Sequence, residues 1–316
     1  MNHCTINYYV RLCMILLMSN TLHAQDWMAR LEKYKPIIEN QTFDQEDENK
    51  EAEDKKHAEA FAIISRQCQT FLEGSAPAIA APQVKSIPII ECQDPIVNLY
   101  DMKHPRVIVM AEQEMLLKAH AHPDDIDPRA DSHPCMRKKV FEILLQMIIE
   151  LDILAVHFGY ETGDLDIYLF EGWRDLDTQK LLFDRKMAQI REANPDFTEE
   201  QAYAETSKWL SPYIDNVPAH STAGAIDIHI YNNKTQQFLD MGPFNKDGTK
   251  APTFSDDPSL QDHQKNNRLL LLAAATRAGL TNYVYEFWHY SYGDRYDCFW
   301  RKDKQDPKYH AIYGSK

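Results

Sequence analysis

The sequence is poor in glycine and has no long apolar run. Only 10 of its 316 residues are Gly, and no Gly-rich loop of the kind that cradles phosphate groups occurs. No segment reaches the roughly 18 consecutive apolar residues that mark a transmembrane helix. No period of about 20 to 50 residues recurs, which argues against solenoids and propellers. Phosphate-loop, membrane-spanning and repeat architectures are therefore not expected.

Positive charge is also scarce. Lys and Arg number 34 against 48 Asp and Glu, giving a net charge of −14, and we find no local basic patch. Nucleic acids and anionic membranes are bound through broad positive fields, so we expect neither as a partner. The 44% hydrophobic and 26% charged content is typical of a folded globular protein.

The N-terminus resembles a secretory signal peptide. Arg11 provides the positive region, residues 12–18 are apolar, and a cleavage site is predicted near His23 and Ala24. We expect residues 1–24 to be removed on export, to the periplasm; the alternative is a disordered leader on a cytoplasmic protein. No C-x-x-C pair occurs, which disfavours zinc-ribbon and thioredoxin-like motifs. Cleavage would leave four cysteines, as two disulfides or as buried free thiols: Cys68, Cys92, Cys135 and Cys298.

The remaining chain divides at a proline-rich stretch. A mixed charge run at 44–59 leads into an amphipathic helical pattern at 58–74, and residues 75–88 contain three prolines. We therefore predict a helical, charged extension with its linker at 25–85 and a main domain at 86–316.

The periodicity of the larger part predicts an α+β fold. Strands and helices follow one another without regular alternation, which favours helices packed on a mostly antiparallel sheet. The predicted helices span 137–158, 175–192, 198–210 and 266–278, and the predicted strands span 165–169, 224–231 and 283–289.

The strand GAIDIHIY at 224–231 carries the sharpest chemical signal. Its isoleucines share one face, and Asp227 and His229 lie on the other. His220 precedes it, and Gly224 would let the chain turn so that His220 and Asp227 converge. An imidazole and a carboxylate suit zinc. The alternative is a pair of surface residues; His229 itself is a ligand, a partner of a ligand or a packed strand histidine.

The segment YEFWHY at 285–290 offers the other half of a zinc site. A carboxylate among aromatic residues is costly to bury unless it is paired or functional. His289 would be the third ligand, and Glu286 the general base for a zinc-activated water. Positions i and i+3 of a strand face opposite ways, so both reach one site only if the chain turns between them. The alternative is an exposed glutamate.

Arg174 follows the predicted strand at 165–169 in the segment FEGWRD. A guanidinium at a strand end can reach into a cleft and stabilise a developing oxyanion. The alternative is a surface ion pair with Asp175 or Asp177.

Taken together, these segments resemble the zinc D-alanyl-D-alanine dipeptidases, which include the vancomycin-resistance dipeptidase. That family has S-x-H-x6-D, E-x-W-H and G-Y-R segments, matched here in the same order by residues 218–227, 286–289 and 172–174. The resemblance covers about residues 86–300. It implies one zinc per chain, and an α+β fold shared with D-Ala-D-Ala carboxypeptidases and the Hedgehog signalling domain. The implied roles are His220, Asp227 and His289 as ligands, Glu286 as base and Arg174 as transition-state stabiliser.

Two positions depart from the family pattern. Pro218 replaces a serine near the substrate, and Asn245 replaces the aspartate that pairs with the substrate's amino group, with Asp247 two residues further on. A neutral amide holds an ammonium group more weakly than a carboxylate does. Asn245 and Asp247 are therefore candidate substrate contacts for a small peptide ending in D-Ala, and strict dipeptide specificity is not implied.

The sequence thus predicts a zinc metallopeptidase that hydrolyses D-Ala-D-Ala or related cell-wall peptides. One alternative is a D-Ala-D-Ala carboxypeptidase or endopeptidase acting on peptidoglycan peptides. Another is a non-catalytic zinc-binding or partner-binding domain, which would need neither Glu286 nor Arg174. HAHPDD at 120–125 echoes a motif of zinc-dependent N-acetylglucosaminyl deacetylases, a minor competing site.

Overall fold

The computed structural model describes residues 25–39, 50–109, 134–207, 210–242 and 251–316. The predicted signal peptide, the HAHPDD segment, Asn245 and Asp247 lie outside the described residues. Among the helices that the structure describes, none is long and apolar enough to cross a membrane.

A mixed sheet forms the centre of the described structure. Its strand order is β2-β4-β5-β8-β7, with the short β6 also paired to β5; only β2 and β4 run parallel among these pairs. This arrangement confirms the predicted α+β class with a mostly antiparallel sheet. The bounds are β2 Val107–Val109, β4 Leu165–Glu171, β5 Ala225–Asn232, β6 Gln237–Phe238, β7 Thr281–Asn282 and β8 His289–Ser291; β1 Ile96–Asn98 and β3 Cys135–Arg137 form a separate pair.

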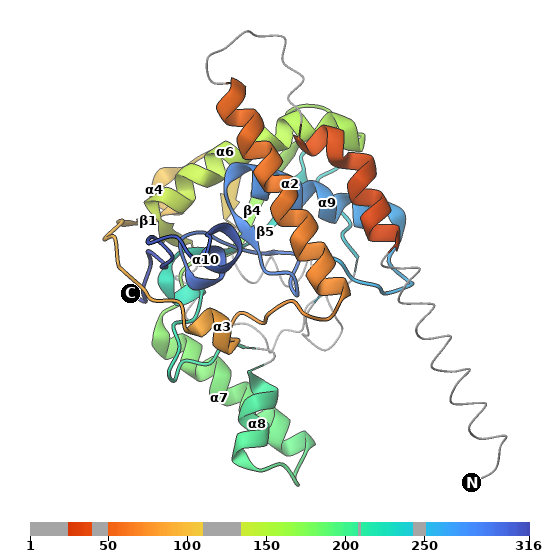
Figure 1. Cartoon of the computed structure of the whole chain (residues 1–316). Coiled ribbons are helices and arrows are strands. Elements are labelled where there is room, and N and C mark those ends of the chain that lie inside the picture. The colour runs from red at the N-terminus through yellow and green to blue at the C-terminus, as the bar shows by residue number, and fades with distance from the viewer. Residues whose placement is uncertain (1–24, 40–49, 110–133, 208–209, 243–250) are drawn as a thin grey trace, which may run out of the picture.

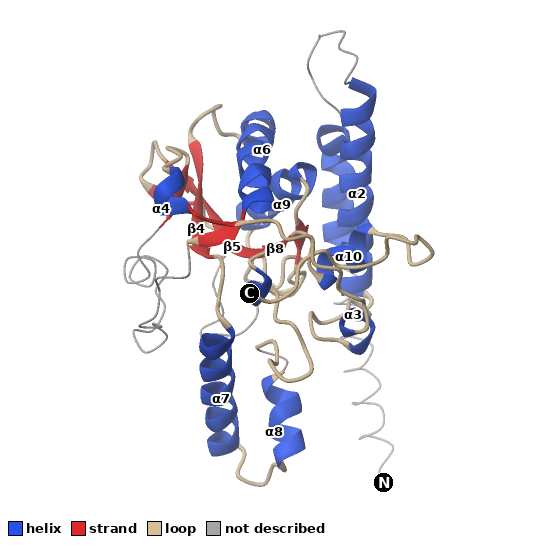
Figure 2. Cartoon of the chain, turned by 90° about the vertical axis from the view of Figure 1, so that its left-hand side faces the viewer, coloured by secondary structure: helices blue, strands red, loops and turns tan. Residues whose placement is uncertain are grey.

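Helices α6 and α9 cover one face of the sheet, and α2 lies against α9 (Figures 1 and 2). The three isoleucines of β5 are completely buried in the same hydrophobic cluster as α6 and α9, as their alternation predicts. Helices α7 and α8 form a hairpin that projects from the body below the sheet (Figure 2). The bounds are α2 Lys50–Leu72, α3 Pro82–Lys85, α4 Leu99–Met102, α6 Lys138–Ala155, η3 Val156–Phe158, α7 Leu176–Ala193, α8 Glu199–Thr206, η4 His220–Thr222, α9 Asp262–Ala278 and α10 Arg295–Arg301.

The N-terminal helices share this core. Trp27 and Leu31, in the helix at 25–39, and Ile64 of α2 are buried in the cluster that contains α6 and α9. The Trp27 indole N–H also donates to the carbonyl of Ser255 at 3.0 Å. The predicted extension therefore packs on the rest of the molecule; the boundary at residues 75–88 stays a prediction.

Three local predictions meet a clear outcome. Residues 283–289 are not one strand: two tight turns separate β7 from β8, and their physical basis is described below. Helix α8 ends at Thr206, short of the predicted residue 210. Of the two alternatives for the four cysteines, disulfides or free thiols, the structure has free thiols. Cys68 and Cys298 are buried.

Candidate metal centre

Three predicted ligands meet where β5 and β8 pair. These strands are antiparallel, and Asp227 lies directly opposite His289 in their register. His220 enters from η4, immediately before β5. The nearest atoms are His220 Nε2, Asp227 Oδ1 and His289 Nδ1, separated by 3.4 Å (His220–Asp227), 3.0 Å (Asp227–His289) and 3.1 Å (His220–His289). Within the described chain, these three residues form the cluster capable of holding a metal ion.

The turn before β5 differs from the expected one in detail. Ala223, with φ of 57°, takes the left-handed conformation, whereas we expected Gly224 to supply the turn. Gly224 is needed for space instead, because a Cβ there would lie 2.6 Å from the carbonyl oxygen of Tyr292. Glycine thus lets the end of η4 pack directly against the chain that follows β8.

The donor set fits zinc. Four tetrahedral ligands with zinc bonds of 2.0–2.1 Å lie about 3.3 Å from one another, close to the separations of these three atoms. His220 Nδ1 donates to the carbonyl of Gly172 at 2.9 Å, which leaves the Nε2 lone pair directed at the cluster. Burial opposes ionisation of Asp227, but the two imidazoles, His220 foremost, hold the pKa of its carboxyl below the ordinary range.

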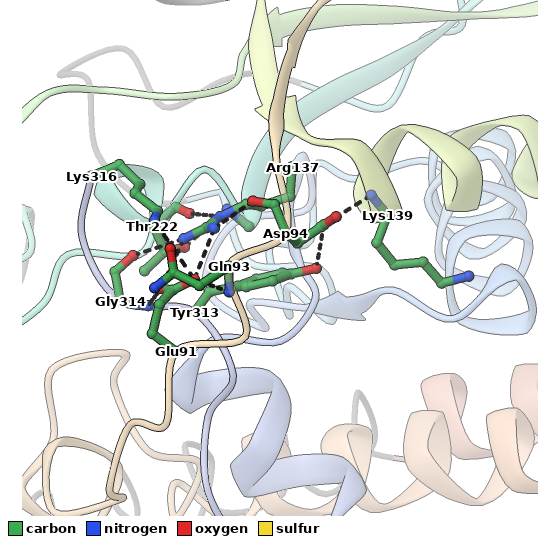
Figure 3. Close-up of polar contacts among 10 residues, drawn as sticks. Glu91, Gln93, Asp94, Arg137, Lys139, Thr222, Tyr313, Gly314 and Lys316 are labelled. Carbon is green, nitrogen blue, oxygen red and sulfur yellow. Dashed lines mark hydrogen bonds and ion pairs between the residues drawn. The ribbon is translucent and has the colours of Figure 1, made fainter.

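A buried arginine, Arg137, holds the turn that carries His220 through its contact with Thr222 (Figure 3). Arg137 Nε donates to the carbonyl of Thr222 at 2.8 Å, and the Arg137 backbone N–H donates to the carbonyl of Ala223. Its guanidinium binds both carboxylate oxygens of Glu91, each at 3.0 Å, and lies over the ring of Tyr313 (Figure 3). Sequence reasoning missed this network, because its members are far apart in the chain.

Arg174 is held by residues other than the predicted surface partners. Glu171 accepts from Nε at 2.6 Å and from Nη2 at 2.5 Å, and Gln179 accepts from Nη1 at 2.8 Å. Asp175 instead caps α7, accepting from the backbone N–H of Thr178 at 2.8 Å. The surface pair with Asp175 or Asp177 is thus replaced by a partly buried clamp.

The sequence contained a signal for this clamp that our reasoning did not use. Glu171 stands three residues before Arg174 at the end of a strand. A bulge between Leu169 and Glu171 places Glu171 opposite Asp227 across β4 and β5. Burial would lower the pKa of Arg174, but Glu171 and, more weakly, Asp227 and Glu286 raise it. The guanidinium is therefore charged and close to the cluster of His220, Asp227 and His289.

The turns between β7 and β8 bring Glu286 to the same place. The backbone N–H of Glu286 donates to the carbonyl of Tyr283 at 2.8 Å, and that of His289 donates to the carbonyl of Glu286 at 3.2 Å. These two turns satisfy the condition under which Glu286 and His289 reach one site. Glu286 Oε2 lies 3.8 Å from His289 Nδ1, and the Glu286 side chain is 19% exposed. The Glu286 carboxylate therefore borders the cluster of His220, Asp227 and His289 and also reaches solvent.

His229 lies outside this cluster. It is buried among the rings of Phe170, Phe238 and Phe287, and the backbone N–H of Ile230 donates to its Nδ1 at 3.0 Å. Burial in this setting lowers the pKa of His229 to about 4, so the ring is neutral at pH 7. Because the cluster of possible ligands contains His220, Asp227 and His289 but not His229, His229 is a packed strand histidine and not a ligand.

A family model described as D-Ala-D-Ala dipeptidase matches residues 146–309, more than half of the chain. The match contains Arg174, His220, Asp227, Glu286 and His289, and it excludes α2 and Arg137. No curated protein matches the chain significantly. The extent of the family match shows that the chain belongs to the D-Ala-D-Ala dipeptidase family of zinc-dependent metallopeptidases.

Proposed function

We propose that this protein is a zinc peptidase that hydrolyses the D-Ala-D-Ala dipeptide or related cell-wall peptides ending in D-Ala. One observation carries the proposal: two imidazoles and a carboxylate converge within 3.4 Å, with Glu286 and Arg174 beside them. A structural zinc site would need the ligands alone. The additional carboxylate and guanidinium favour catalysis over a non-catalytic zinc-binding or partner-binding role.

His220, Asp227 and His289 would hold one zinc per chain, leaving a coordination position open. When bound, zinc polarises the peptide carbonyl and makes water a stronger nucleophile at neutral pH. The family match supports zinc as the metal. The fixed tautomer of His220, whose Nδ1–H donates to Gly172, keeps its other nitrogen available as a ligand.

Glu286 would move the proton. Its carboxylate takes a proton from the attacking water as the new C–O bond forms, and returns it to the amine nitrogen as the C–N bond breaks. The position of Oε2 beside His289 Nδ1 supports this role, because the base must lie within reach of a water at the cluster. The partial exposure of Glu286 gives substrate access to the same carboxylate.

Arg174 would stabilise the charge that develops on the carbonyl oxygen. In the described contacts, Glu171 and Gln179 accept three of the five guanidinium N–H bonds. The remaining two can donate to an oxyanion, and the clamp keeps the planar group in place before the reaction begins. Because the hydrogen bonds strengthen as charge develops, they act on the transition state more than on bound substrate.

The substrate is either a free dipeptide or a longer peptide. Asn245 and Asp247 are proposed contacts for the peptide's amino end, and Asn245 lacks the charge that would select a free dipeptide. A carboxypeptidase or endopeptidase on peptidoglycan peptides is therefore the second candidate. Export to the periplasm, where such peptides occur, remains a proposal that rests on the signal-like residues 1–24.

Metal analysis combined with a peptide panel tests this function. The panel contains D-Ala-D-Ala, longer peptides that end in D-Ala-D-Ala, and L-Ala-L-Ala as the stereochemical control. We expect about one zinc per chain and cleavage of the D-configured peptides alone. Hydrolysis of the longer peptides but not of the dipeptide would select the carboxypeptidase. Full zinc occupancy without cleavage of any peptide would contradict the enzymatic proposal.

A further inference from the structure

A single buried side chain closes the turns that carry Glu286. Asn282 Nδ2 donates to the carbonyl of Glu286 at 3.1 Å and to the carbonyl of His289 at 3.0 Å. The Thr253 hydroxyl in turn donates to Asn282 Oδ1 at 2.6 Å. Both amide hydrogens and the amide oxygen are thus used, and the side chain is completely buried. One amide therefore fixes the backbone of the proposed base and of a proposed zinc ligand.

Helix α2 contacts the backbone of Asn282. Asn282 belongs to β7, the terminal strand in the order of the described sheet. Gln67 of α2 donates from Nε2 to the Asn282 carbonyl at 2.9 Å, and Gln67 is also completely buried. A chain of hydrogen bonds thus leads from α2, which the family model does not match, to the turn that carries Glu286.

The residue next to Glu286 is fixed by the same region of the chain. The Tyr285 hydroxyl donates to the carbonyl of Ala76 at 2.8 Å, just beyond the end of α2. The Tyr285 ring also contacts Phe71 of α2, with ring centroids 5.5 Å apart. Two independent contacts therefore join the N-terminal extension to this turn.

The bonding of Gln67 separates a positioning role from simple stabilisation. Its Oε1 is buried without a hydrogen-bond partner among the described residues, and such an oxygen costs stability. Methionine has a similar shape and would remove this oxygen, but would leave the Asn282 carbonyl unpaired in its place. The substitution exchanges one unpaired oxygen for another, so the overall stability should change little. What it removes is the hydrogen bond to Asn282, whose side chain holds the Glu286 turn.

We infer that Asn282 and Gln67 are positioning residues, and that α2 is part of the catalytic apparatus because it fixes the Glu286 turn through them. The consequence for turnover rests on the proposed role of Glu286. Catalysis depends on placement to within fractions of an ångström, and a displacement of about 1 Å can cost about a hundredfold in rate. The restraint of the turn itself does not depend on that role.

The first experiment compares Gln67→Met with Gln69→Met in the full-length, zinc-loaded protein. Gln69 lies on the same helix but is exposed, and its amide donates to Glu73. For Gln67→Met we expect kcat to fall about tenfold or more with KM nearly unchanged. Amide hydrogen exchange should become faster at residues 283–289, and the melting temperature should stay close to that of wild type. Gln69→Met should match wild type in every measurement.

The second experiment changes Asn282. Asn282→Asp keeps the acceptor for Thr253 but replaces Nδ2, which donates to both carbonyls, with an oxygen, and Asn282→Ala removes the whole amide. The Asn282 amide also holds the backbone of His289. Asn282→Ala should therefore weaken the binding of Zn²⁺, measured against a chromophoric chelator, by about tenfold or more. Gln67→Met keeps the inference testable if either variant of this buried residue does not fold.

Equal hydrogen exchange at residues 283–289 in the two glutamine variants would overturn the inference, whatever the activity. A general rise in exchange over α2 and α9 with a lower melting temperature would also overturn it, because Gln67 would then be structural. If wild type cleaves no peptide while Gln67→Met still loosens the turn, the proposed function fails and the positioning of the turn stands.

Discussion

Asp227 on β5 lies directly opposite His289 on β8, with 3.0 Å between Oδ1 and Nδ1. On its other side Asp227 faces Glu171 of β4, which clamps Arg174. One row across three strands thus carries two proposed zinc ligands and the residue that holds the proposed oxyanion stabiliser. Because the ladders fix these positions before any ligand binds, little reorganisation is needed when a peptide arrives.

His220→Ala should abolish stoichiometric zinc binding. It removes one of two imidazoles from a three-residue cluster, and two remaining ligands hold zinc weakly. The control is His229→Gln, which changes a buried histidine of β5 that lies outside the cluster. Metal analysis after dialysis should give about one zinc per chain for wild type and for the control. Full occupancy in His220→Ala would show that the ligand assignment is wrong.

Glu286→Gln should keep zinc and lose turnover. The amide preserves the shape of the side chain but cannot accept the proton of the attacking water. We expect the rate to fall by at least about a hundredfold, the lower range for general acid–base catalysis. The measurements are zinc content and steady-state hydrolysis of any peptide that wild type cleaves. Near-normal hydrolysis would remove Glu286 from the mechanism and favour the binding-domain alternative.

The site was predictable from sequence where local pattern determines geometry. The alternation in β5 separated its buried isoleucines from Asp227, and the structure places both sets as predicted. The segment 283–289 was predicted as a strand because its aromatic residues have high β propensity. Its turns depend on Asn282, whose contacts with two carbonyls are made only in the folded chain. Local propensity carries no information about such a contact.

The supporting contacts were not predictable for a related reason. Arg137 and Glu91 are 46 residues apart, and Gln67 and Asn282 are 215 apart. No spacing rule joins residues so distant in a single sequence. Glu171 is the exception: its position three residues before Arg174 at a strand end was readable as a local clamp.

Acid should destabilise the metal-free protein partly through His229. Burial lowers the pKa of His229 to about 4 from an ordinary value of 6.5, so between these values only the unfolded chain is protonated. The contribution of the neutral His229 to the free energy of unfolding is therefore fully present above pH 6.5. It is lost as the pH falls towards 4, by about 1.4 kcal/mol for each pH unit and roughly 3 kcal/mol in total.

The comparison of wild type with His229→Gln isolates this contribution. Denaturant unfolding in the presence of a chelator, at pH 7, 6 and 5, removes the separate effect of zinc release. The difference in unfolding free energy between wild type and the variant should shrink as the pH falls. His157→Gln changes an exposed histidine and should keep the acid sensitivity of wild type. A difference that is constant over this range would show that His229 is protonated equally in the folded and unfolded states.

Substitution of Arg174 should lower kcat, and so should substitution of Glu171, which orients its guanidinium. Arg174→Ala removes a donor from the proposed oxyanion site, which costs about a hundred- to a thousandfold in kcat. Arg174→Lys keeps a charge but loses the planar fork that Glu171 and Gln179 hold, so it should also be impaired. Glu171→Gln should reduce kcat by less, because the guanidinium stays present but is less firmly oriented.

Asp177→Asn, an exposed change in the first turn of α7, should leave kcat and KM unaltered and shift stability by no more than about 1 kcal/mol. Steady-state kinetics of the four variants, with zinc content checked for each, distinguishes stabilisation of the oxyanion from stabilisation of the fold alone. An unchanged kcat in Arg174→Ala with a lowered melting temperature would show that the Glu171–Arg174 pair only stabilises the start of α7.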